Sequence, residues 1–204
     1  MPMWEFEHNA QNCGYTIIAG VDEAGRGPLA GPVVSAAVIL PGNFSVTGID
    51  DSKKLSEKTR AALFPLIKHQ ALAVGTGIAS HLEIDQLNIL QASLLSMKRA
   101  VENLFIRPDF LLIDGKFKID SSINQMPIVK GDSKSISIAA ASIIAKVTRD
   151  AIMTELHKTY PEYNFLQHKG YPTKAHKAAV LEYGPCPVHR RSFRGVKEVS
   201  DGNG

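Results

Sequence analysis

Two adjacent acidic residues stand between an apolar run and a glycine-rich loop, and this arrangement constrains the fold more than any other stretch. The apolar run is Tyr15–Val21, the acids are Asp22 and Glu23, and the loop that follows holds three glycines and two prolines. A second apolar run, Val33–Leu40, comes next. The two runs predict strands paired antiparallel across the loop. Charge is thus held at the end of a sheet, beside backbone that a ligand can approach closely. A solvated hairpin turn is the alternative, since Asp, Gly and Pro are common turn residues.

The composition is that of a folded chain with one main domain. Of the 204 residues, 44% are hydrophobic and 21% are charged, which allows a substantial core and argues against global disorder. The two cysteines, Cys13 and Cys186, stand at opposite ends of the sequence and do not have the spacing of a metal site. They indicate free thiols in a reducing compartment. The sequence shows neither a signal peptide nor an apolar run of membrane-spanning length. We therefore expect a cytoplasmic protein that does not contact a membrane.

Positive charge gathers near the C-terminus, although the formal net charge of the whole chain is only +3. Between Phe165 and Lys197 there is a single acid, Glu182. The basic side chains of this segment are Lys169, Lys174, Lys177, Arg190, Arg191, Arg194 and Lys197, with His168, His176 and His189 among them. Such a patch favours a polyanionic partner, although a basic tail can also be merely solvated.

Helices and strands alternate after the first two strands. We predict helices from an N-cap at Ser56 to about His69 with a kink or break at Pro65, from His81 to about Leu104, from Ile136 to Tyr160, and over Lys174–Tyr183. We predict strands over Ala71–Ala79, weakened by Gly75 and Gly77, over Phe110–Ile113 and over Ile128–Val129. This order favours an α/β fold in which a mixed sheet is flanked by helices.

Two further acids follow later elements. Asp114 ends a predicted strand, and Asp132 stands just before the long predicted helix. Each has a structural alternative, because Asp114 can belong to a turn with Gly115 and Asp132 can cap the helix. Consecutive strand residues point to opposite faces, so Asp22 and Glu23 share a site only if the strand ends or twists there.

A cluster of these four carboxylates requires shared protons or cations. Two like charges about 4 Å apart repel by about 4 kcal/mol at an effective dielectric of 20, so unshared charges cannot stay together. Oxygen ligands without Cys or His point to Mg²⁺ or Mn²⁺. Two such ions would activate a water and stabilise the leaving oxygen of a phosphodiester. The basic C-terminal segment then fits a nucleic-acid substrate.

Several blocks, taken together, resemble the type 2 ribonucleases H, and most closely the bacterial ribonuclease HII group. The resemblance runs from about Tyr15 to Val196 and is carried by the stretches 20–27, 51–55, 114–115, 130–133, 139–150 and 168–171. It implies a ribonuclease H-like fold with a small helical C-terminal extension. It also implies hydrolysis of RNA in RNA–DNA hybrids and nicking on the 5′ side of ribonucleotides embedded in duplex DNA, which leaves 3′-hydroxyl and 5′-phosphate ends.

The resemblance also implies roles for single residues. Asp22, Glu23, Asp114 and Asp132 would be the catalytic, metal-binding carboxylates, with Mn²⁺ or Mg²⁺ as cofactor. The loop Gly25-Arg26-Gly27 would recognise the ribose 2′-OH, which distinguishes RNA from DNA and which backbone groups can reach at glycine. Tyr171 would pack against the sugar of the next, deoxy, nucleotide. Lys53 and the cations of the C-terminal segment would hold phosphates.

The expected organisation has four parts. Residues 1–14 are an unassigned N-terminal segment, 15–160 form the catalytic domain, 161–199 form the basic helical extension, and 200–204 are a frayed tail. We expect a monomer whose partner is nucleic acid. The sequence does not fix the physiological metal, the preference between hybrids and single ribonucleotides, or any protein partner.

Parts of the sequence are also compatible with three other functions. A non-catalytic nucleic-acid binder would use the acids as caps and turns. A dinucleotide enzyme is suggested by Gly25-Arg-Gly-Pro-Leu-Ala30, although that fingerprint must open a helix and a strand is predicted instead. A Ser/Lys hydrolase is suggested by Ser52-Lys53 and Ser133-Lys134, which are better interpreted as loop or capping residues. His176 and His189 could assist proton transfer or be polar surface groups.

Overall fold

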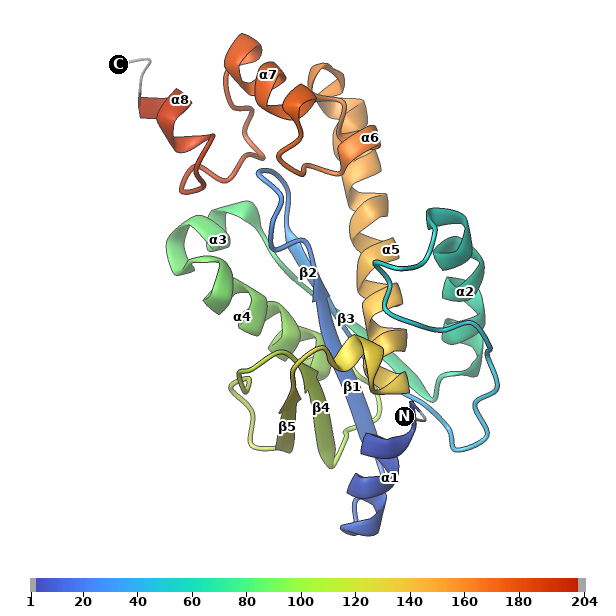
Figure 1. Ribbon diagram of the computed structural model, residues 1–204. Helices are drawn as coiled ribbons and strands as arrows, with labels where there is room; N and C mark the ends of the chain where they lie inside the picture. Colours follow the sequence, from blue (N-terminus) through green and yellow to red (C-terminus); the bar gives the residue numbers. More distant parts are fainter. Residues whose placement is uncertain (1–2, 202–204) are drawn as a thin grey trace.

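The sheet has five strands in the order β3-β2-β1-β4-β5 in the computed structural model, which describes residues 3–201 (Figure 1). The strands are β1 Ile18–Ala24, β2 Val33–Ile39, β3 Ala73–Ala79, β4 Phe110–Asp114 and β5 Asn124–Ile128. β1 pairs antiparallel with β2, and β2 with β3, whereas β1–β4 and β4–β5 are parallel. The prediction of a mixed sheet and of antiparallel pairing across the glycine loop is therefore confirmed.

Most strand ends differ from the prediction by one to three residues, and two strands differ in ways that matter for the site and the sheet. β1 runs on to Ala24, so Asp22 and Glu23 lie inside the strand and not after it, because β2 continues to pair with β1 as far as Ala24 opposite Val34. β5 ends at Ile128, where the prediction had it begin. Its polar residues and Pro127 do not form the apolar pattern that predicts a strand. An edge strand tolerates proline because one of its two sides has no neighbouring strand to which it must donate hydrogen bonds.

Helices cover both faces of the sheet. They are α1 Glu5–Asn12, α2 Glu57–Gln70, α3 His81–Leu87, α4 Ile89–Glu102, α5 Ile136–Thr159, α6 Phe165–His168, α7 Lys174–Tyr183 and α8 Lys197–Asp201, with 3₁₀ turns η1 Gly131–Ser133 and η2 Pro161–Tyr163. α5 and α2 enclose one apolar core with β2. α4 encloses a second core with the other face of the sheet. The chain is thus a sheet between two helical layers (Figure 1).

The predicted helix from His81 to Leu104 is two helices. Asn88 breaks it with φ +71°, a conformation that asparagine tolerates better than other non-glycine residues. Its side-chain oxygen then accepts hydrogen bonds from the backbone N–H groups of Leu90 and Gln91, at 3.0 and 3.2 Å. These bonds satisfy the first donors of α4 and fix where it begins.

α2 begins where predicted but is not broken at Pro65. The Ser56 side chain accepts from the N–H of Thr59 at 3.0 Å, as an N-cap does. The helix continues through Pro65 to Gln70. A proline leaves the carbonyl four residues earlier without its partner, and that residue, Ala61, is exposed and can bind water instead.

Glycines let helices lie directly on the strands. A Cβ placed on Gly20 of β1 would lie 2.2 Å from the backbone carbon of Ser137 in α5. A Cβ on Gly77 of β3 would lie 2.1 Å from the Ser96 oxygen and 2.4 Å from the Ala100 nitrogen, both backbone atoms of α4. The glycines that weaken β3 as a strand prediction are therefore contact points for a helix.

Gly77→Ala is expected to destabilise the protein by about 2 kcal/mol, because α4 must move away from β3 to admit a methyl group. Gly42→Ala is the matched control, since nothing lies within 4 Å of a Cβ at that loop position. Urea denaturation of both variants measures the effect. Equal unfolding free energies for the two variants would contradict this account of the β3–α4 contact.

The two ends of the described chain also pack onto the fold. The Met3 carbonyl accepts from the N–H of Ile136 at 2.7 Å, so the segment before α1 meets the start of α5. At the other end Ser200 and Asp201 belong to α8, whereas residues 202–204 of the predicted frayed tail lie outside the described residues. Between residues 3 and 201, no helix combines the length and the apolar composition that crossing a membrane requires.

Candidate active site: three carboxylates beside a glycine loop

Three of the four predicted carboxylates come from neighbouring parallel strands. The pairing of β1 with β4 ends at Val21 opposite Ile113, so Asp22 and Asp114 are the next residue on each strand. Parallel strands end at the same edge of a sheet, which brings these two side chains together. One oxygen from each of Asp22, Glu23 and Asp114 lies within 4.8 Å of the others. The longer side chain of Glu23 reaches the group although it follows Asp22 directly on the strand.

Burial and hydrogen bonds fix the carboxylates in place. Asp22 is only 3% exposed, and its Oδ1 accepts from the backbone N–H of Glu23 at 2.6 Å. Asp114 Oδ1 accepts from the N–H of Gly131 at 2.7 Å, which ties the end of β4 to η1. Glu23 Oε1 lies 3.4 Å from Nη1 of Arg26 in the glycine loop. Each acid is therefore held by backbone or by a neighbour before any ligand arrives.

The electrostatics of the group favour protons or cations. Burial, followed by the charges of Glu23 and Asp114, raises the pKa of Asp22 well above its usual range. Burial also raises the pKa of Glu23 to about 7, against the opposing effect of Arg26. The pKa of Asp114 is raised too, chiefly by burial. Carboxyl groups with raised pKa values in one cluster are the expected signature of a functional site.

The donor set fits a hard divalent cation. All three donors are carboxylate oxygens, the ligands that Mg²⁺ and Mn²⁺ prefer. Two oxygens that each lie about 2.1 Å from a Mg²⁺ can be at most about 4.2 Å apart. The three oxygens lie within 4.8 Å of one another, which is near that limit.

Asp132 does not join the group of three. Its Oδ2 accepts from Nζ of Lys53 at 3.1 Å, and the carboxylate is 6% exposed. It remains a close neighbour, because the adjacent Gly131 is bonded to Asp114 and the charge of Asp132 contributes to raising the pKa of Asp114. The expectation that four carboxylates share one pocket is thus met for three, and Lys53 neutralises the fourth. Asp132 is not the cap of α5 either, since the Ser135 hydroxyl accepts from the N–H of Ile138.

The glycine loop lies against Tyr171. Gly25 has φ +102° and is buried, whereas Arg26 and Gly27 are exposed. A Cβ on Gly27 would be 3.6 Å from Cε1 of Tyr171, so the loop and the ring face each other. Nζ of Lys146 stands 5.8 Å from the centre of the same ring. Sequence patterns gave no sign of Lys146, because its place beside Tyr171 depends on how α5 packs against the C-terminal extension.

Two histidines of the basic segment, His176 and His189, are buried, so of the two alternatives left open for them the polar surface group is excluded. The Cys186 N–H donates to Nδ1 of His189 at 3.0 Å, so the hydrogen of that ring is on Nε2. It can donate to Nε2 of His176 at 3.1 Å, and Nδ1–H of His176 in turn donates to the Tyr171 carbonyl at 2.9 Å. Burial lowers the pKa of both rings to about 4. The pair is therefore neutral at pH 7 and anchors the backbone of Tyr171.

The geometry excludes two of the alternative functions, the dinucleotide enzyme and the Ser/Lys hydrolase. The glycines of the 25–30 motif lead into β2 and not into a helix, so they do not form a dinucleotide-binding turn. The Ser133 hydroxyl donates to the Lys130 carbonyl, and Nζ of Lys134 donates to the Val129 carbonyl. Lys53 is bound to Asp132. Neither serine therefore has its lysine as a hydrogen-bonded base.

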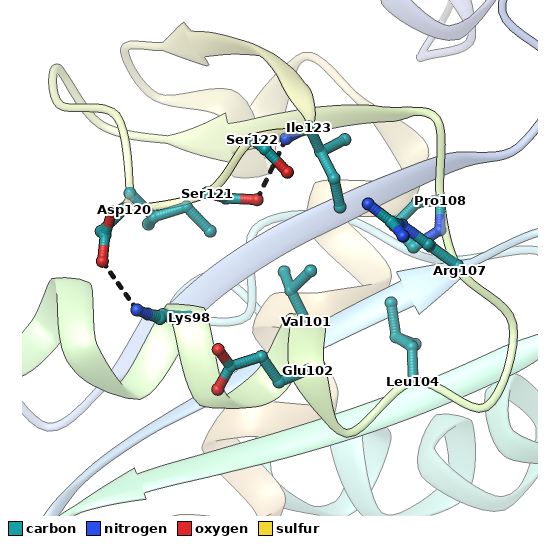
Figure 2. A pocket seen from close by; sticks show the side chains of 11 residues that line it. Lys98, Val101, Glu102, Leu104, Arg107, Pro108, Asp120, Ser121, Ser122 and Ile123 are labelled. Atoms are coloured by element: carbon teal, nitrogen blue, oxygen red, sulfur yellow. Dashed lines mark hydrogen bonds and ion pairs between the residues drawn. The ribbon is translucent and has the colours of Figure 1, made fainter.

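A separate cavity of about 530 Å³ lies between α4 and the loop that joins β4 to β5 (Figure 2). Lys98 Nζ and Asp120 Oδ2 form an ion pair of 2.6 Å across its mouth. Leu104 and Pro108 in its wall precede β4, whereas Asp114 ends that strand. The cavity is thus at the opposite end of β4 from the carboxylates and is not part of their site.

Comparison with known proteins agrees with this architecture. The family model described as Ribonuclease HII matches residues 19–196. The chain is 57% identical over 196 residues to the ribonuclease HII of Geobacter metallireducens, a match that covers 96% of this chain and 92% of that one. The structure is similar to that of ribonuclease H2 from Pyrococcus horikoshii OT3, with a TM-score of 0.76, 26% identity and coverage of 92% and 98% of the two chains.

The fold extends to a more distant structure, Bst-RNase HIII in complex with Mn²⁺. It has a TM-score of 0.75 at 18% identity and covers 98% of this chain and 73% of that one. The ribonuclease H-like mixed sheet predicted from the sequence is therefore confirmed. Together with the match over nearly the whole chain, these findings show that the protein belongs to the ribonuclease HII family.

Proposed function

We propose that the protein is an endoribonuclease that hydrolyses the RNA strand of RNA–DNA hybrids and nicks on the 5′ side of ribonucleotides embedded in duplex DNA. The observation that carries this proposal is the group of carboxylate oxygens of Asp22, which is buried, and of Glu23 and Asp114, which are half-buried, at the carboxyl end of parallel strands. Family membership gives the substrate class. In the reaction a water oxygen bonds to phosphorus and the bond from phosphorus to the 3′ oxygen breaks, which leaves a 3′-hydroxyl and a 5′-phosphate.

Asp22, Glu23, Asp114 and Asp132 are the residues that would hold Mg²⁺ or Mn²⁺. When bound, such an ion supplies a Lewis acid and lowers the pKa of a coordinated water. The chain contributes the fixed positions of the oxygens and a buried setting in which charges act strongly. For Asp132 to offer its oxygens to an ion, Lys53 would have to release it, and this exposed lysine could then contact a substrate phosphate.

Gly25, Arg26, Gly27 and Tyr171 would recognise the junction between ribose and deoxyribose. The support for this assignment is that Gly27 faces the Tyr171 ring and that Arg26 reaches Glu23 of the carboxylate group. A ribose bound between the loop and the ring would therefore lie beside the carboxylates. Backbone groups can recognise the 2′-OH here because no side chain intervenes at the glycines.

A groove beside the loop supports a polyanionic substrate. It has a volume of about 680 Å³, begins at Gly27 and runs along the C-terminal extension. Two cations, Lys177 and Arg194, and one acid, Glu198, line it together with apolar residues that include Leu29 and Phe193. Cations on an apolar groove suit phosphates and sugars of a nucleic acid. We propose accordingly that residues 161–199 act as a substrate-binding extension of the catalytic domain 15–160, and that the enzyme works as a monomer.

The test is cleavage of a DNA duplex that contains one ribonucleotide, with an all-DNA duplex of the same sequence as control. With Mg²⁺ or Mn²⁺ we expect a single nick 5′ to the ribonucleotide and none in the control, and EDTA should abolish it. Binding that is equally tight in EDTA, with no product under either ion, would instead identify a non-catalytic nucleic-acid binder.

A further inference from the structure

Two arginines are buried behind the glycine loop without an acidic partner. Arg149 of α5 and Arg190 of the C-terminal extension are each 0% exposed. Between residues 3 and 201, neither forms an ion pair with a carboxylate. Burying an unpaired charge is costly unless its hydrogen bonds are satisfied. Arg190 was predicted from sequence to be a phosphate contact in a basic patch, and its burial rules that role out.

Both guanidinium groups bind backbone carbonyls instead. Arg190 donates to the carbonyl oxygens of Gly25 (2.6 Å), Arg26 (3.0 Å), Gly31 (2.9 Å) and Pro32 (3.2 Å). Arg149 donates to those of Ala30 (3.1 Å), Pro32 (3.0 Å) and Lys169 (3.0 Å). The planar fork of arginine offers five N–H donors spread over three nitrogens, whereas lysine offers three donors on a single nitrogen. The two side chains thus bind carbonyls at the start of the loop, residues 25–26, and at its end, residues 30–32.

The bonds to Gly25 and Arg26 set the orientation of two successive peptide groups. In a trans peptide the C=O and the N–H point in opposite directions. Because the carbonyls of Gly25 and Arg26 point at Arg190, the N–H groups of Arg26 and Gly27 point away from it, toward the exposed side of the loop. Neither N–H has a hydrogen-bond partner within the described part of the chain. Two adjacent free N–H donors form a concave site for an oxygen ligand.

The loop also cannot rearrange freely around these arginines. A Cβ on Gly25 would lie 2.1 Å from Nε of Arg149, so the glycine packs directly on that side chain. Leu29 N–H donates to the Gly170 carbonyl, and Arg190 N–H donates to the Leu29 carbonyl, at 2.8 Å each. The segment that carries Arg190 is therefore fixed to the loop by its backbone as well as by its side chain.

We propose that Arg190, supported by Arg149, is a positioning residue for specificity: it holds the N–H groups of Arg26 and Gly27 outward, where they bind the oxygen of the ribose 2′-OH. This inference rests on the proposed function and deepens it. It assigns discrimination between ribose and deoxyribose to a residue of the C-terminal extension that does not touch the substrate.

Arg190→Lys keeps a positive charge but cannot bind four carbonyls, so it is the variant that tests the proposal. We expect kcat on the single-ribonucleotide duplex to fall by about tenfold to 100-fold, with little change in KM, because the loop is misplaced and the groove is intact. Mn²⁺ binding measured by calorimetry should stay within about twofold, since the carboxylates are held by other contacts. Arg99→Lys is the control, because Arg99 also binds a backbone carbonyl, that of Ile78, but lies on α4.

Other outcomes separate this inference from the proposed function. If the wild-type protein does not nick the ribonucleotide duplex, the proposed function fails. If it does and Arg190→Lys matches its kcat, only the role of Arg190 is overturned. A kcat loss accompanied by loss of Mn²⁺ binding would also overturn it, since the effect would then be general misfolding.

A measurement on the wild-type protein tests the same point without a variant. Backbone N–H groups of Arg26 and Gly27 should exchange rapidly in the free protein and be protected when the ribonucleotide duplex is added in EDTA. The all-DNA duplex should protect them less. Equal protection by the two duplexes would overturn the assignment of these donors to the 2′-OH.

Discussion

Asp22→Asn is expected to lower kcat on the single-ribonucleotide duplex by about 10³-fold. The cation that this carboxylate would hold contributes several kcal/mol of transition-state stabilisation, and each 1.36 kcal/mol is about a tenfold change in rate. Asparagine keeps the size of the side chain and a carbonyl oxygen that can accept from the N–H of Glu23. It removes the negative charge at the centre of the group of three carboxylates.

Asp120→Asn is the matched control for this experiment. Asp120 forms an ion pair with Lys98 at the cavity of Figure 2, at the other end of β4 from the carboxylate group. We expect its kcat to equal that of the wild type. Calorimetry with Mn²⁺ gives a second measurement, in which Asp22→Asn should bind the ion at least about tenfold more weakly. Cleavage by Asp22→Asn at the wild-type rate would contradict the proposed role of the cluster.

Glu23→Gln is expected to stabilise the metal-free protein at pH 8. Burial raises the pKa of Glu23 from its ordinary 4.5 to about 7, so the folded state binds this proton more tightly than the unfolded state does. The stabilisation from that proton is complete below pH 4.5 and is lost as the pH rises through 7. The difference between the two pKa values corresponds to about 3 kcal/mol. This is the upper limit by which the free energy of unfolding of Glu23→Gln can exceed that of the wild type at pH 8.

Urea denaturation in EDTA at pH 5 and pH 8 measures this effect. The wild type should lose more stability than Glu23→Gln between the two pH values. Glu155→Gln serves as control, because Glu155 is an exposed partner of Lys158 and its loss should change stability by less than about 0.5 kcal/mol. Adding Mn²⁺ at pH 8 should make the wild type more stable than Glu23→Gln. An ion that binds the folded state stabilises it, and the wild type keeps the carboxylate of Glu23 as a ligand. Equal wild-type and Glu23→Gln stabilities at pH 8 without metal would refute the argument.

The helices and the central strands were largely predictable because their signals are local. Ser56 and the run Lys174–Tyr183 marked helix positions correctly, and β2 and β4 were evident as apolar runs between turn residues. Asn88 shows where local signals fail. Its left-handed backbone divides a continuous apolar stripe into α3 and α4, because a polar side chain capping the next helix outweighs the periodicity.

The carboxylate cluster was predictable only in part. Acids at strand ends indicated a site, but the sequence could not say that Asp22 and Glu23 lie within β1, nor that Lys53 holds Asp132 apart from the other three. Those facts depend on where β2 and β4 stop pairing with β1, and on a loop residue 79 positions away from its partner along the chain.

The order of residues by itself determined most of the helices and the central strands, the acidic and glycine-rich segment that marks the site, and the family to which the chain belongs. Only the tertiary structure decided which charges are exposed. Arg190, His176 and His189 belong to a segment that is basic in sequence, yet all three are buried. The physical reason is that burial and hydrogen-bond partners are set by segments distant in sequence, here the carbonyls of the glycine loop and of Tyr171.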